Sequence, residues 1–582
     1  MPEQGSFNSA PYCLSANIMQ MLESQRIIDP GETSQQMLTR VTDTLFSPEA
    51  QFGTSPAEIA ALKVQFASYV VDGYMIPGTP TLTNAGRRPE SALSSCVVIP
   101  VDLRKRTESE QTIRSYYAQN MGSGFDLSPY DDPVGMITWL NQLAVNETAT
   151  GAHDRYIGNM ASLHITHPHI VDFINLKRRD GSFPHFNISI DISKEFMQAV
   201  SENGSFQLTD GAQVDANELF HTIAECTWLT GDPGILFLDR INDDNPIPAV
   251  GRYVTTPPCG EMGLAEGETC QFGYLNLNQF TSDDGQINYP LLAQVTTLTT
   301  RALDNAIEQS LSHYPTAIST TITAIKRKIG IGVCGLAEML MKSRLPYDSE
   351  GARSLARDVL SFVNFISTKS SVELAGERGS CIAMFDRVQN RYFTEPFLEQ
   401  KYACRPTNSV SADDWTGLAD TIRTTGYLRN ILTTALPPTG RASVILGVTS
   451  AIEPFFNIVD REGNIQPHIA TFVRHAIPDI ADQTLTDAKT NGTFQTLDYI
   501  PKPIRELLRT AQEISPMGHI SMVGALAGTH GVVDEAASKT VNLPQSASVE
   551  DIKEIFLLAH NIGLKNIAVY RNKSKAGQPK EL

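Results

Sequence analysis

A cysteine and a glutamate lie two residues apart in the segment 255–277, TTPPCGEMGLAEGETCQFGYLNL. Two prolines precede the cysteine and a glycine follows it, which favours an extended loop over a helix. In such a loop the side chains of Cys259 and Glu261 point the same way. A thiol and a carboxylate presented together suit covalent or radical chemistry at sulfur with proton transfer by the acid. From spacing alone, Cys259 and the nearby Cys270 could equally be buried apolar cysteines.

A second segment, ALPPTGRASVILG at 435–447, has the composition of a phosphate-binding turn. Thr439, Gly440 and Ser443 offer hydroxyls and unobstructed backbone N–H groups. Arg441 adds a fork of N–H donors that matches a phosphate. The segment matches no Walker pattern, and an ordinary turn between two elements explains it as often as phosphate binding does.

The composition narrows the class of protein. Apolar residues make up 41% of the 582 residues and charged residues 19%, which is typical of a folded protein. The 46 basic and 64 acidic residues give a net charge of −18, which argues against nucleic-acid polymers and anionic membranes as partners. No window approaches the roughly 20 apolar residues that span a bilayer, and the start of the chain has no leader pattern, so we expect a cytoplasmic protein.

Cysteines and histidines give no metal-site pattern. The eight cysteines never occur as CxxC, so neither a disulfide scaffold nor a zinc ribbon is favoured. The run HITHPH (164–169) is interrupted by Pro168 and has no acidic or cysteine cluster beside it. We therefore expect no metal, and any reactive cysteine must act through neighbours brought close by the fold.

Helix-like and strand-like segments alternate after a helical start. The first 75 residues show helical apolar spacing, and from about Pro77 onward the two kinds alternate, which predicts an α/β fold with mostly parallel strands. Alternation of apolar and polar residues predicts a strand over 186–192, and apolar runs predict strands at 235–239, 442–446 and 567–570. Ser193 and Ser548 are predicted helix caps, and the glycines of 122–124 predict a flexible loop.

Ten ordered segments run along almost the whole chain: PGTPTLTNAG, LSSCVVIPV, RYIGNMASLHITHPHIVDFINLKR, FNISI, TGDPGILFLDRIN, PPCGE, ETCQFGYLNL, IGIGVCGLAEML, PPTGRASVILGVTSAIEPFF and SKTVNLP before IAVYRNKS. Together they resemble the catalytic subunit of ribonucleotide reductase, most closely the adenosylcobalamin-dependent class II. Class I enzymes receive their radical through a tyrosine pair near the C-terminus, where this chain has only Tyr570. Class III enzymes end in a glycyl-radical loop and a cysteine cluster, and the tail AGQPKEL has neither.

The resemblance implies a fold and a division of the chain. The fold is a ten-stranded α/β barrel whose central finger loop holds the radical cysteine. A helical N-terminal region is expected over 1–76, the barrel over 77–545, and a C-terminal helix and strand that close the barrel over 546–582.

The same resemblance implies roles for individual residues. Cys259 would be the thiyl radical that takes the 3′ hydrogen of the ribose, and Glu261 the base on the 3′ hydroxyl. Cys96 and Cys270 would be the reducing pair that ends as a disulfide. Arg155 falls in the segment that resembles the loop between substrate base and effector. The residues expected to bind the substrate and its phosphates are Pro80, Thr81, Ser95, Thr439, Gly440, Arg441, Ala442 and Ser443.

Cofactor and partners also follow from the resemblance. The cofactor would be adenosylcobalamin and the substrate a ribonucleoside di- or triphosphate, with a deoxynucleoside triphosphate (dNTP) as a candidate effector. No cysteine pair lies near the C-terminus, the last cysteine being Cys404, so an external thiol reductant of the thioredoxin or glutaredoxin type is expected. Both a monomer and a homodimer stay open.

Two departures from the family pattern leave alternatives open. Pro257 stands where an asparagine is common, and Arg441 stands where a smaller residue is usual, so its charge could favour a more highly phosphorylated substrate. One alternative is a radical reductase-like enzyme that modifies a nucleotide in a specialised pathway. The other is a catalytically dead nucleotide-binding paralogue, which would have no need to retain Cys96, Cys259, Glu261 and Cys270 together.

Overall fold

The computed structural model describes residues 14–179, 181–460 and 463–574. The predicted N-terminal region is thus described from residue 14 onward, and the C-terminal region up to residue 574. The tail AGQPKEL and the first 13 residues, on which the leader prediction rests, lie outside the described residues.

Five parallel strands form one half of a barrel. They follow one another in chain order, because helices return the chain to the same end of the sheet after each strand. The strands are β2 (Cys96–Val98), β3 (Gly122–Asp126), β4 (Asn159–His164), β5 (Phe186–Asp191) and β8 (Gly234–Leu236). The helices between and after them are α5 (Arg106–Ala118), α6 (Pro133–Ala149), α7 (Ile170–Ile174), α8 (Lys194–Ser201), α9 (Ala216–Thr230) and α10 (Leu238–Asp243).

The second half is also parallel and closes the ring. β10 pairs with β11, and β12 pairs with β13. Isolated parallel bridges link β11 to Thr434 and Leu436 to Ala537, just before β12. The halves meet in antiparallel pairs, β8 with β13 and β2 with β9, so the hydrogen bonding runs round a closed ring. The strands of this half are β9 (Thr269–Cys270), β10 (Phe272–Asn276), β11 (Gly330–Cys334), β12 (Thr540–Leu543) and β13 (Asn566–Arg571).

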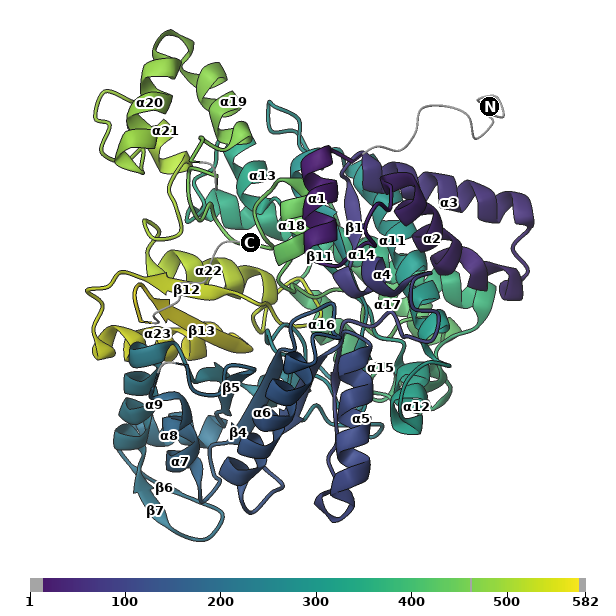
Figure 1. Cartoon of the computed structure of the whole chain (residues 1–582), viewed down its shortest axis with the longest axis vertical. Coiled ribbons are helices and arrows are strands. Elements are labelled where there is room, and N and C mark those ends of the chain that lie inside the picture. The colour runs from purple at the N-terminus through teal and green to yellow at the C-terminus, as the bar shows by residue number, and fades with distance from the viewer. Residues whose placement is uncertain (1–13, 180, 461–462, 575–582) are drawn as a thin grey trace.

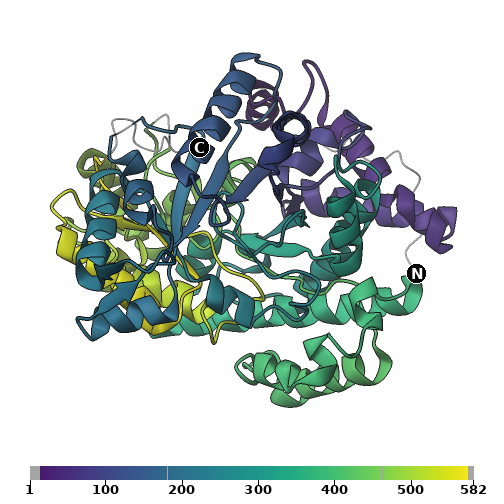
Figure 2. The ribbon, with the colours of Figure 1, turned by 90° about the horizontal axis from the view of Figure 1, so that it is seen from below.

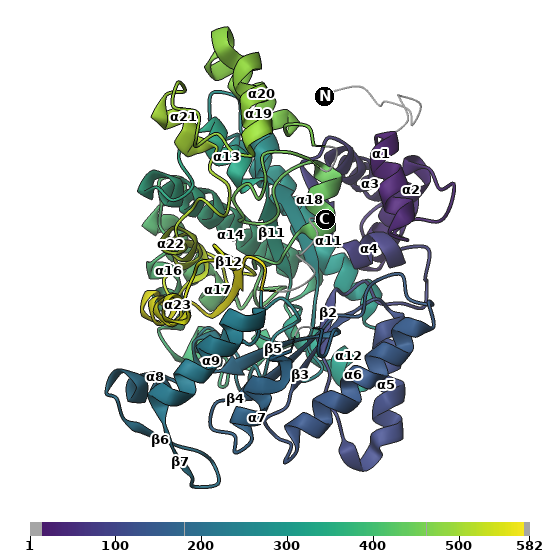
Figure 3. The ribbon, with the colours of Figure 1, turned by 60° about the vertical axis from the view of Figure 1, so that its left-hand side comes forward.

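The predicted α/β barrel is therefore present, and the strand number depends on how its irregular parts are counted. Among the described residues the ring has ten members if β9 and β10, separated only by Gln271, count as one strand and segment 434–436 as another. A short strand, β1 (Met75–Pro77), lies antiparallel beside β10. A small hairpin, β6 (Ser205–Gln207) and β7 (Gln213–Asp215), projects at the bottom of Figure 3.

Helices surround the barrel, as Figure 1 shows. The N-terminal helices lie at the upper right of that view, and α5 to α9 lie below. The N-terminal helices are α1 (Ala16–Ser24), α2 (Ser34–Phe46), α3 (Pro56–Val71) and α4 (Thr79–Asn84). The helices that pack around the second half are α11 (Tyr289–Ser310), α12 (Ala317–Lys326), α13 (Leu336–Lys342), α14 (Glu350–Arg378), α18 (Gly440–Leu446), α22 (Pro516–Ala527) and α23 (Val549–Ile562).

One apolar core joins the regions that the sequence divides. It extends from Leu22 in α1 to Val569 in β13 and includes residues of the N-terminal helices, the barrel and α23. The N-terminal, barrel and C-terminal regions are thus a division of the chain rather than separately packed units. Ser193 and Ser548 cap α8 and α23 through their hydroxyls, as predicted.

Two groups of helices have apolar clusters of their own, which the sequence analysis does not anticipate. One group packs around Trp415 and comprises α15 (Arg391–Thr394), α16 (Phe397–Ala403) and α17 (Ala412–Thr425), the green helices at the lower edge of Figure 2. The other packs around Phe494 and comprises α19 (Pro467–Ala476), α20 (Ala481–Asn491) and α21 (Lys502–Leu507), at the top of Figure 1. Among the described residues, no helix combines the length and apolarity that crossing a membrane requires.

Two secondary-structure predictions are wrong. The glycines of 122–124 form the start of the buried strand β3, not a flexible loop. A Cβ on Gly124 would lie 2.3 Å from the carbonyl oxygen of Thr256, so glycine is needed for close backbone approach. The apolar run 442–446 lies in helix α18, not in a strand. Pro438 lies just before this helix, and Gly447, in a left-handed conformation with φ of 66°, ends it, so a short buried helix fits between them.

Candidate active site

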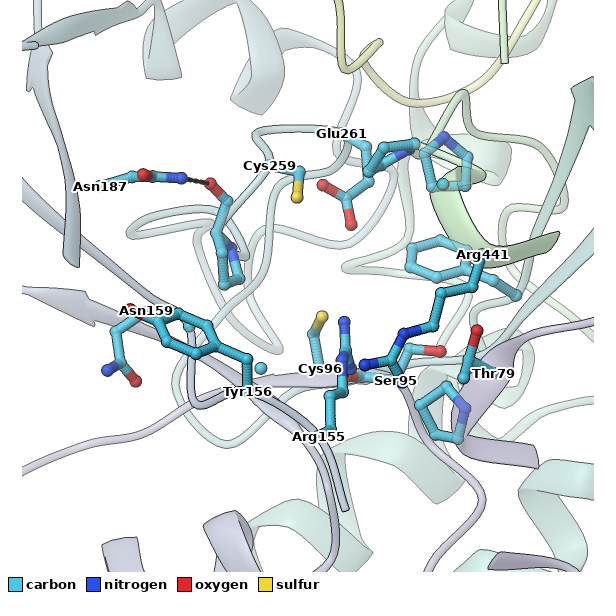
Figure 4. A pocket seen from close by; sticks show the side chains of 18 of the residues that line it. Thr79, Ser95, Cys96, Arg155, Tyr156, Asn159, Asn187, Cys259, Glu261 and Arg441 are labelled. Carbon is cyan, nitrogen blue, oxygen red and sulfur yellow. Dashed lines mark hydrogen bonds between the residues drawn. The ribbon is translucent and has the colours of Figure 1, made fainter. Parts of the chain in front are cut away.

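A cavity of about 460 Å³ opens inside the barrel, and both halves of the ring contribute to its wall. Figure 4 shows Cys259 and Glu261 on one side of it, with Cys96, Arg155 and Arg441 across from them. The lining residues that matter below come from the start of α4, from β2, β4 and β5 and the loops before them, from the loop that carries Cys259 and from the start of α18. They are Thr79, Pro80, Ser95, Cys96, Arg155, Tyr156, Asn159, His185, Asn187, Cys259, Glu261, Thr439, Gly440 and Arg441.

The loop that carries Cys259 crosses the barrel interior. We call residues 255–264 the finger loop, because Thr255 and Leu264 pair at its base in an antiparallel bridge. Its tip is held through two carbonyl groups, and the donors come from both halves of the barrel. Asn187 Nδ2 donates to the Pro258 carbonyl at 2.8 Å, and Asn566 Nδ2 donates to the Gly260 carbonyl at 2.9 Å. Gly260 itself has φ of 78°, which a side chain would strain.

The base of the finger loop and the residues that flank it, 253 and 263–265, are together called the stem, and they rest on a buried ionic network. Lys328 Nζ donates to the Gly263 carbonyl at 2.6 Å, and the Gly263 N–H donates to Glu535 at 3.2 Å. Lys328 also forms an ion pair with Glu535, at 3.1 Å. The carbonyl and the N–H of Gly263 are therefore both hydrogen-bonded by one charged pair, Lys328 and Glu535.

A second glutamate extends this network. Glu268 pairs with Lys326 at 2.8 Å and with Lys328 at 3.3 Å, and it accepts the Ala265 N–H. Burial raises the pKa of Glu268, but the two lysines outweigh it and bring this pKa below its ordinary value. The ring of Tyr253 lies beneath both ammonium groups, 4.8 Å from Lys326 and 4.2 Å from Lys328.

The thiol of Cys259 is open to the cavity although the barrel encloses it. Its side chain is exposed to the cavity rather than packed against other side chains. The surrounding protein nevertheless removes it from bulk water, and this burial raises the pKa of the thiol well above its ordinary value, with Glu261 and Cys96 adding to the effect. The group therefore stays protonated at neutral pH. A neutral S–H suits hydrogen-atom exchange, whereas nucleophilic attack or metal binding needs the thiolate.

Glu261 is almost fully buried and lacks a counter-charge at close range. It is 2% exposed, and its Oε2 atom has no hydrogen-bond partner among the described residues. Burial raises its pKa to about 7, while Arg155 acts in the opposite direction. A carboxyl with this pKa can gain or lose a proton near neutral pH, which a general base requires.

Cys96 and Cys270 lie directly opposite each other on the antiparallel strands β2 and β9. Both are free thiols. Residues opposite each other in such a pair have Cβ atoms roughly 4.5–5.5 Å apart, close to the roughly 3.5–4.5 Å of a disulfide. Cys96 lines the cavity, whereas Cys270 does not and lies behind it. Burial, with Cys96 as the next contribution, raises the pKa of Cys270 well above its ordinary value.

Two arginines point into the cavity without a carboxylate partner among the described residues. Arg155 donates to the carbonyls of Ser95 and Asn120, at 3.1 Å each. Burial lowers the pKa of Arg441, and the charge of Arg155 lowers it further. Figure 4 shows the Arg441 guanidinium directed toward Arg155 and Ser95. Two neighbouring cations with no protein counter-charge form a site for an anion such as phosphate.

The structure brings together part of the predicted phosphate-binding set. Pro80, Ser95, Thr439, Gly440 and Arg441 line the cavity. The other three are buried and lie outside its lining, because their polar groups bond internally or their side chain packs in the core. The Thr81 hydroxyl donates to the Leu93 carbonyl, the Ser443 hydroxyl donates to the Gly440 carbonyl, and Ala442 belongs to the apolar core.

Several lining residues are missing from the sequence prediction, and Asn187 shows why. The alternation over 186–192 marks Asn187 as the polar face of a strand, which in an open sheet faces solvent. In the closed ring this face meets the cavity and the finger loop instead. The alternation therefore indicates that Asn187 faces the cavity only when the barrel is already known. Thr79, Tyr156, Asn159 and His185 gave no such signal.

A second cavity, also of about 460 Å³, adjoins Cys259 from another side. It shares Asn187, Pro258, Cys259 and Pro438 with the first. Strands β8, β12 and β13 supply much of its wall, including Tyr570, whose buried hydroxyl has no hydrogen-bond partner among the described residues. The thiol of Cys259 therefore stands between two spaces of ligand size.

Comparisons with known proteins agree with this architecture. The family model "Ribonucleotide reductase, barrel domain" matches residues 112–570. A protein of Mycobacterium tuberculosis named "Vitamin B12-dependent ribonucleoside-diphosphate reductase" is 30% identical, over 94% of this chain and 77% of that protein. A Thermoplasma acidophilum protein of the same name is 28% identical, over 86% of this chain and 64% of that protein.

A solved structure has the same fold. The "class Id ribonucleotide reductase alpha subunit" of Actinobacillus ureae superposes with a TM-score of 0.75, over 98% of this chain and 99% of that one, at 16% identity. This structural similarity shows a shared fold. The family model that matches residues 112–570 and the 30% sequence identity to the Mycobacterium tuberculosis protein show the family to which the chain belongs. The chain belongs to the ribonucleotide reductase family.

Proposed function

We propose that this protein reduces ribonucleotides to 2′-deoxyribonucleotides with adenosylcobalamin as its radical source. One observation carries the proposal: Cys259, Glu261 and Cys96 face one enclosed cavity that also holds two arginines with no carboxylate partner among the described residues. The relatives named as vitamin B12-dependent reductases support the choice of cofactor. The substrate is a ribonucleotide, with its ribose against Cys259 and its phosphates toward Arg441.

Reduction of the ribose needs four functions from the protein: an acceptor for a hydrogen atom, a base, an acid and a donor of two reducing equivalents. Cys259, as a thiyl radical, takes the 3′ hydrogen, and Glu261 accepts the proton of the 3′ hydroxyl. The thiol of Cys96, which faces the cavity, protonates the departing 2′ hydroxyl, which leaves as water. Cys96 and Cys270 then form a disulfide and supply the hydrogen that replaces the hydroxyl. Cys259 returns its hydrogen to C3′, and Glu261 returns the proton to the 3′ oxygen. The balance is ribonucleotide plus two thiols giving deoxyribonucleotide, water and a disulfide.

The second cavity is where the reactive end of the cofactor would reach Cys259. The Tyr570 hydroxyl, which has no hydrogen-bond partner among the described residues, gives this cavity a free polar group. Asn542, Asn566 and Tyr570 are the residues that would face the group. When bound, adenosylcobalamin supplies the one-electron oxidising equivalent that converts the thiol of Cys259 to a radical. This chain's own contribution is to hold Cys259 at the border of both spaces.

The reductant and the effector form the finer part of the proposal. Among the described residues, Cys96 and Cys259 line the cavity and Cys270 lies behind it, whereas Cys226, Cys334, Cys381 and Cys404 lie outside the lining. A small dithiol, or a redoxin of the thioredoxin or glutaredoxin type, would therefore reduce the Cys96–Cys270 disulfide from outside. The loop 150–158, which carries Arg155 into the cavity, is the segment through which a bound dNTP would act.

The decisive experiment is an anaerobic assay of the purified protein. It contains adenosylcobalamin, dithiothreitol and each of the four ribonucleotides as di- or triphosphate, and 2′-deoxy products are separated by chromatography. We expect deoxynucleotide only when the cofactor is present, and none from Cys259→Ala. The matched control is Cys381→Ala, which removes a buried thiol from the separate cluster around Trp415 and should keep activity.

The same assay separates the alternatives. A modified nucleotide that is not the 2′-deoxy product would favour the specialised pathway over reduction. Absence of any product, with nucleotide binding intact in both wild type and Cys259→Ala, would favour a binding paralogue. Because Pro257 replaces an asparagine amide, the product analysis must identify the position of the lost hydroxyl.

Arg441 permits a separate test of phosphate recognition. Its guanidinium lies in the cavity with no carboxylate partner, so the proposal assigns it to the outer phosphates of the substrate. Replacement by threonine should raise KM about tenfold and reduce the preference for triphosphate over diphosphate, since a hydrogen bond to a charged group contributes about 1.5–3 kcal/mol. An unchanged KM ratio between di- and triphosphate would contradict this assignment.

A further inference from the structure

One exposed aromatic side chain lies in the wall of the first cavity. Tyr156, in the loop between α6 and β4, is 59% exposed and lines the same space as Cys259. In Figure 4 Tyr156 and Arg441 lie toward opposite sides of the view, with Cys96 and Arg155 between them. The ring of Tyr156 has no role in the chemistry proposed above.

The ring of Tyr156 is fixed rather than free to turn. It stacks on the imidazole of His185, with centroids 4.9 Å apart and an angle of 21° between the planes. Its hydroxyl donates to the Pro184 carbonyl at 2.6 Å. His185 is buried, and its Nδ1 donates to the Ile157 carbonyl at 2.9 Å, so the support of the ring is itself anchored.

This arrangement leaves a rigid aromatic surface open on the cavity side. One face of the ring is covered by His185, and the hydroxyl is already bonded, so the open face is the free binding feature of this side chain. An aromatic face held in place loses little conformational freedom when a flat ligand stacks on it. Bases of all four kinds have such a flat face, and stacking tolerates their differences.

The polar neighbours of the platform are engaged within the protein. Asn159 donates through Nδ2 to the His185 carbonyl at 3.1 Å, and its Oδ1 accepts from the Tyr117 hydroxyl at 3.1 Å. This amide therefore has little left with which to read the edge of a base. A flat ligand at this end of the cavity would therefore be held by stacking on the ring of Tyr156 rather than by base-specific hydrogen bonds.

We propose that the Tyr156–His185 pair is the stacking platform for the nucleobase of the substrate. The proposal rests on the proposed function, in that it takes the cavity to hold a ribonucleotide. The phosphates lie at Arg441, the ribose lies against Cys259 and Glu261, and the base lies on Tyr156. The platform accepts purines and pyrimidines alike, with purines bound more tightly because they cover more of the ring.

The test measures the contribution of the base directly. Binding of AMP and of ribose 5-phosphate, which differ only by the base, is measured by calorimetry on the full-length protein without cofactor. Wild type should bind AMP more tightly than ribose 5-phosphate. Tyr156→Leu should weaken AMP about 5- to 150-fold and leave ribose 5-phosphate unchanged. Tyr156→Phe, which keeps the ring and loses only the hydroxyl, should stay within about threefold of wild type for AMP.

Three results would overturn the platform. They are equal binding of AMP and ribose 5-phosphate by wild type, an unchanged AMP affinity in Tyr156→Leu, and an equal loss for both ligands, which would make Tyr156 a support for the loop only.

Turnover separates this proposal from the proposed function. If AMP binding depends on Tyr156 but the anaerobic assay yields no deoxynucleotide, reduction fails and the platform stands. If deoxynucleotides form and Tyr156→Leu leaves KM unchanged for all four substrates, reduction stands and the platform fails. A raised KM, larger for purines than for pyrimidines and with a smaller change in kcat, supports both.

Discussion

The tip of the finger loop and the segment that follows its stem each contain a buried glutamate, and the two behave in opposite ways. Glu261 at the tip is 2% exposed and Glu268 below the stem is 1% exposed, so their depth is the same. Burial raises the pKa of Glu261 to about 7, whereas Lys326 and Lys328 outweigh the same effect and lower the pKa of Glu268. Counter-charges within contact distance, and not depth, decide the state of each carboxyl.

This difference separates a structural role of the stem from a chemical role of the tip. The stem has its charges paired and its backbone groups bonded, which fixes the position of the loop inside the barrel. The tip has an unpartnered carboxylate oxygen and a protonated thiol, which costs stability but keeps both groups available for reaction. Substitutions at the tip should therefore reduce activity, and substitutions at the stem should reduce stability.

The largest effect is expected from Glu261→Gln, measured as kcat in the anaerobic assay. Glutamine keeps the shape of the side chain but cannot accept a proton, so kcat should fall about 10²- to 10⁴-fold. The melting temperature at neutral pH should not fall, because no ion pair is lost. A large drop in melting temperature together with full activity would reverse the division between tip and stem.

Lys328→Met should give the largest loss of stability. It leaves Glu535 without its ion-pair partner and removes the bond to the Gly263 carbonyl, which should lower the free energy of unfolding by about 3–5 kcal/mol. Chemical denaturation of wild type and variant measures this difference in the free energy of unfolding. Lys63→Met is the matched control, because Lys63 pairs with Asp43 at the surface, where such a pair contributes about 0–1 kcal/mol. Equal losses for the two variants would remove the special status of the stem.

The pH dependence of stability should differ between wild type and Glu261→Gln. The pKa of Glu261 is about 7 in the folded protein against an ordinary value of 4.5, so the folded state binds the proton more tightly than the unfolded state. This group's contribution to stability is therefore full below pH 4.5 and is lost as the pH rises through 7, a change of about 3 kcal/mol. Relative to wild type, Glu261→Gln should gain stability over this range. Parallel curves for the two proteins would contradict the raised pKa.

The smallest effect is expected from Glu535→Gln, which links stem and tip. The charge of Glu535 contributes to the raised pKa of Glu261, so its removal should move the acid limb of the kcat/KM profile to lower pH. Glutamine can still accept the Gly263 N–H, and Lys328 keeps Glu268 as a partner. A limb that stays in place, with only a lower melting temperature, would assign Glu535 to the stem alone.

Local sequence signals located the tip but not its surroundings. The two-residue spacing of Cys259 and Glu261, between proline and glycine, was enough to predict that both side chains face one side, because this depends only on the loop itself. The meeting with Cys96, 163 residues earlier in the chain, came from the family resemblance, since no local pattern encodes a contact between distant strands.

The two wrong secondary-structure predictions have different causes. Gly122 and Gly124 look like loop residues because glycine is rare in strands, yet they belong to β3, where a distant segment, the finger loop, approaches the backbone. The run at 442–446 looks like a strand by composition, but the turn residues on both sides make it a short helix. Three of the eight expected substrate contacts, Thr81, Ala442 and Ser443, lie outside the cavity lining, because a motif match does not say which way a side chain faces.

The closed ring also constrains the order in which the protein can fold. β8 finds its outer partner only in β13, which lies more than 300 residues later in the chain, so the ring stays open until β13 is available. Until then β8 presents an unpaired edge, which invites pairing with other chains. Contacts of such long range make folding slow. We therefore expect this protein to need a chaperone most during the interval between the synthesis of β8 and that of β13.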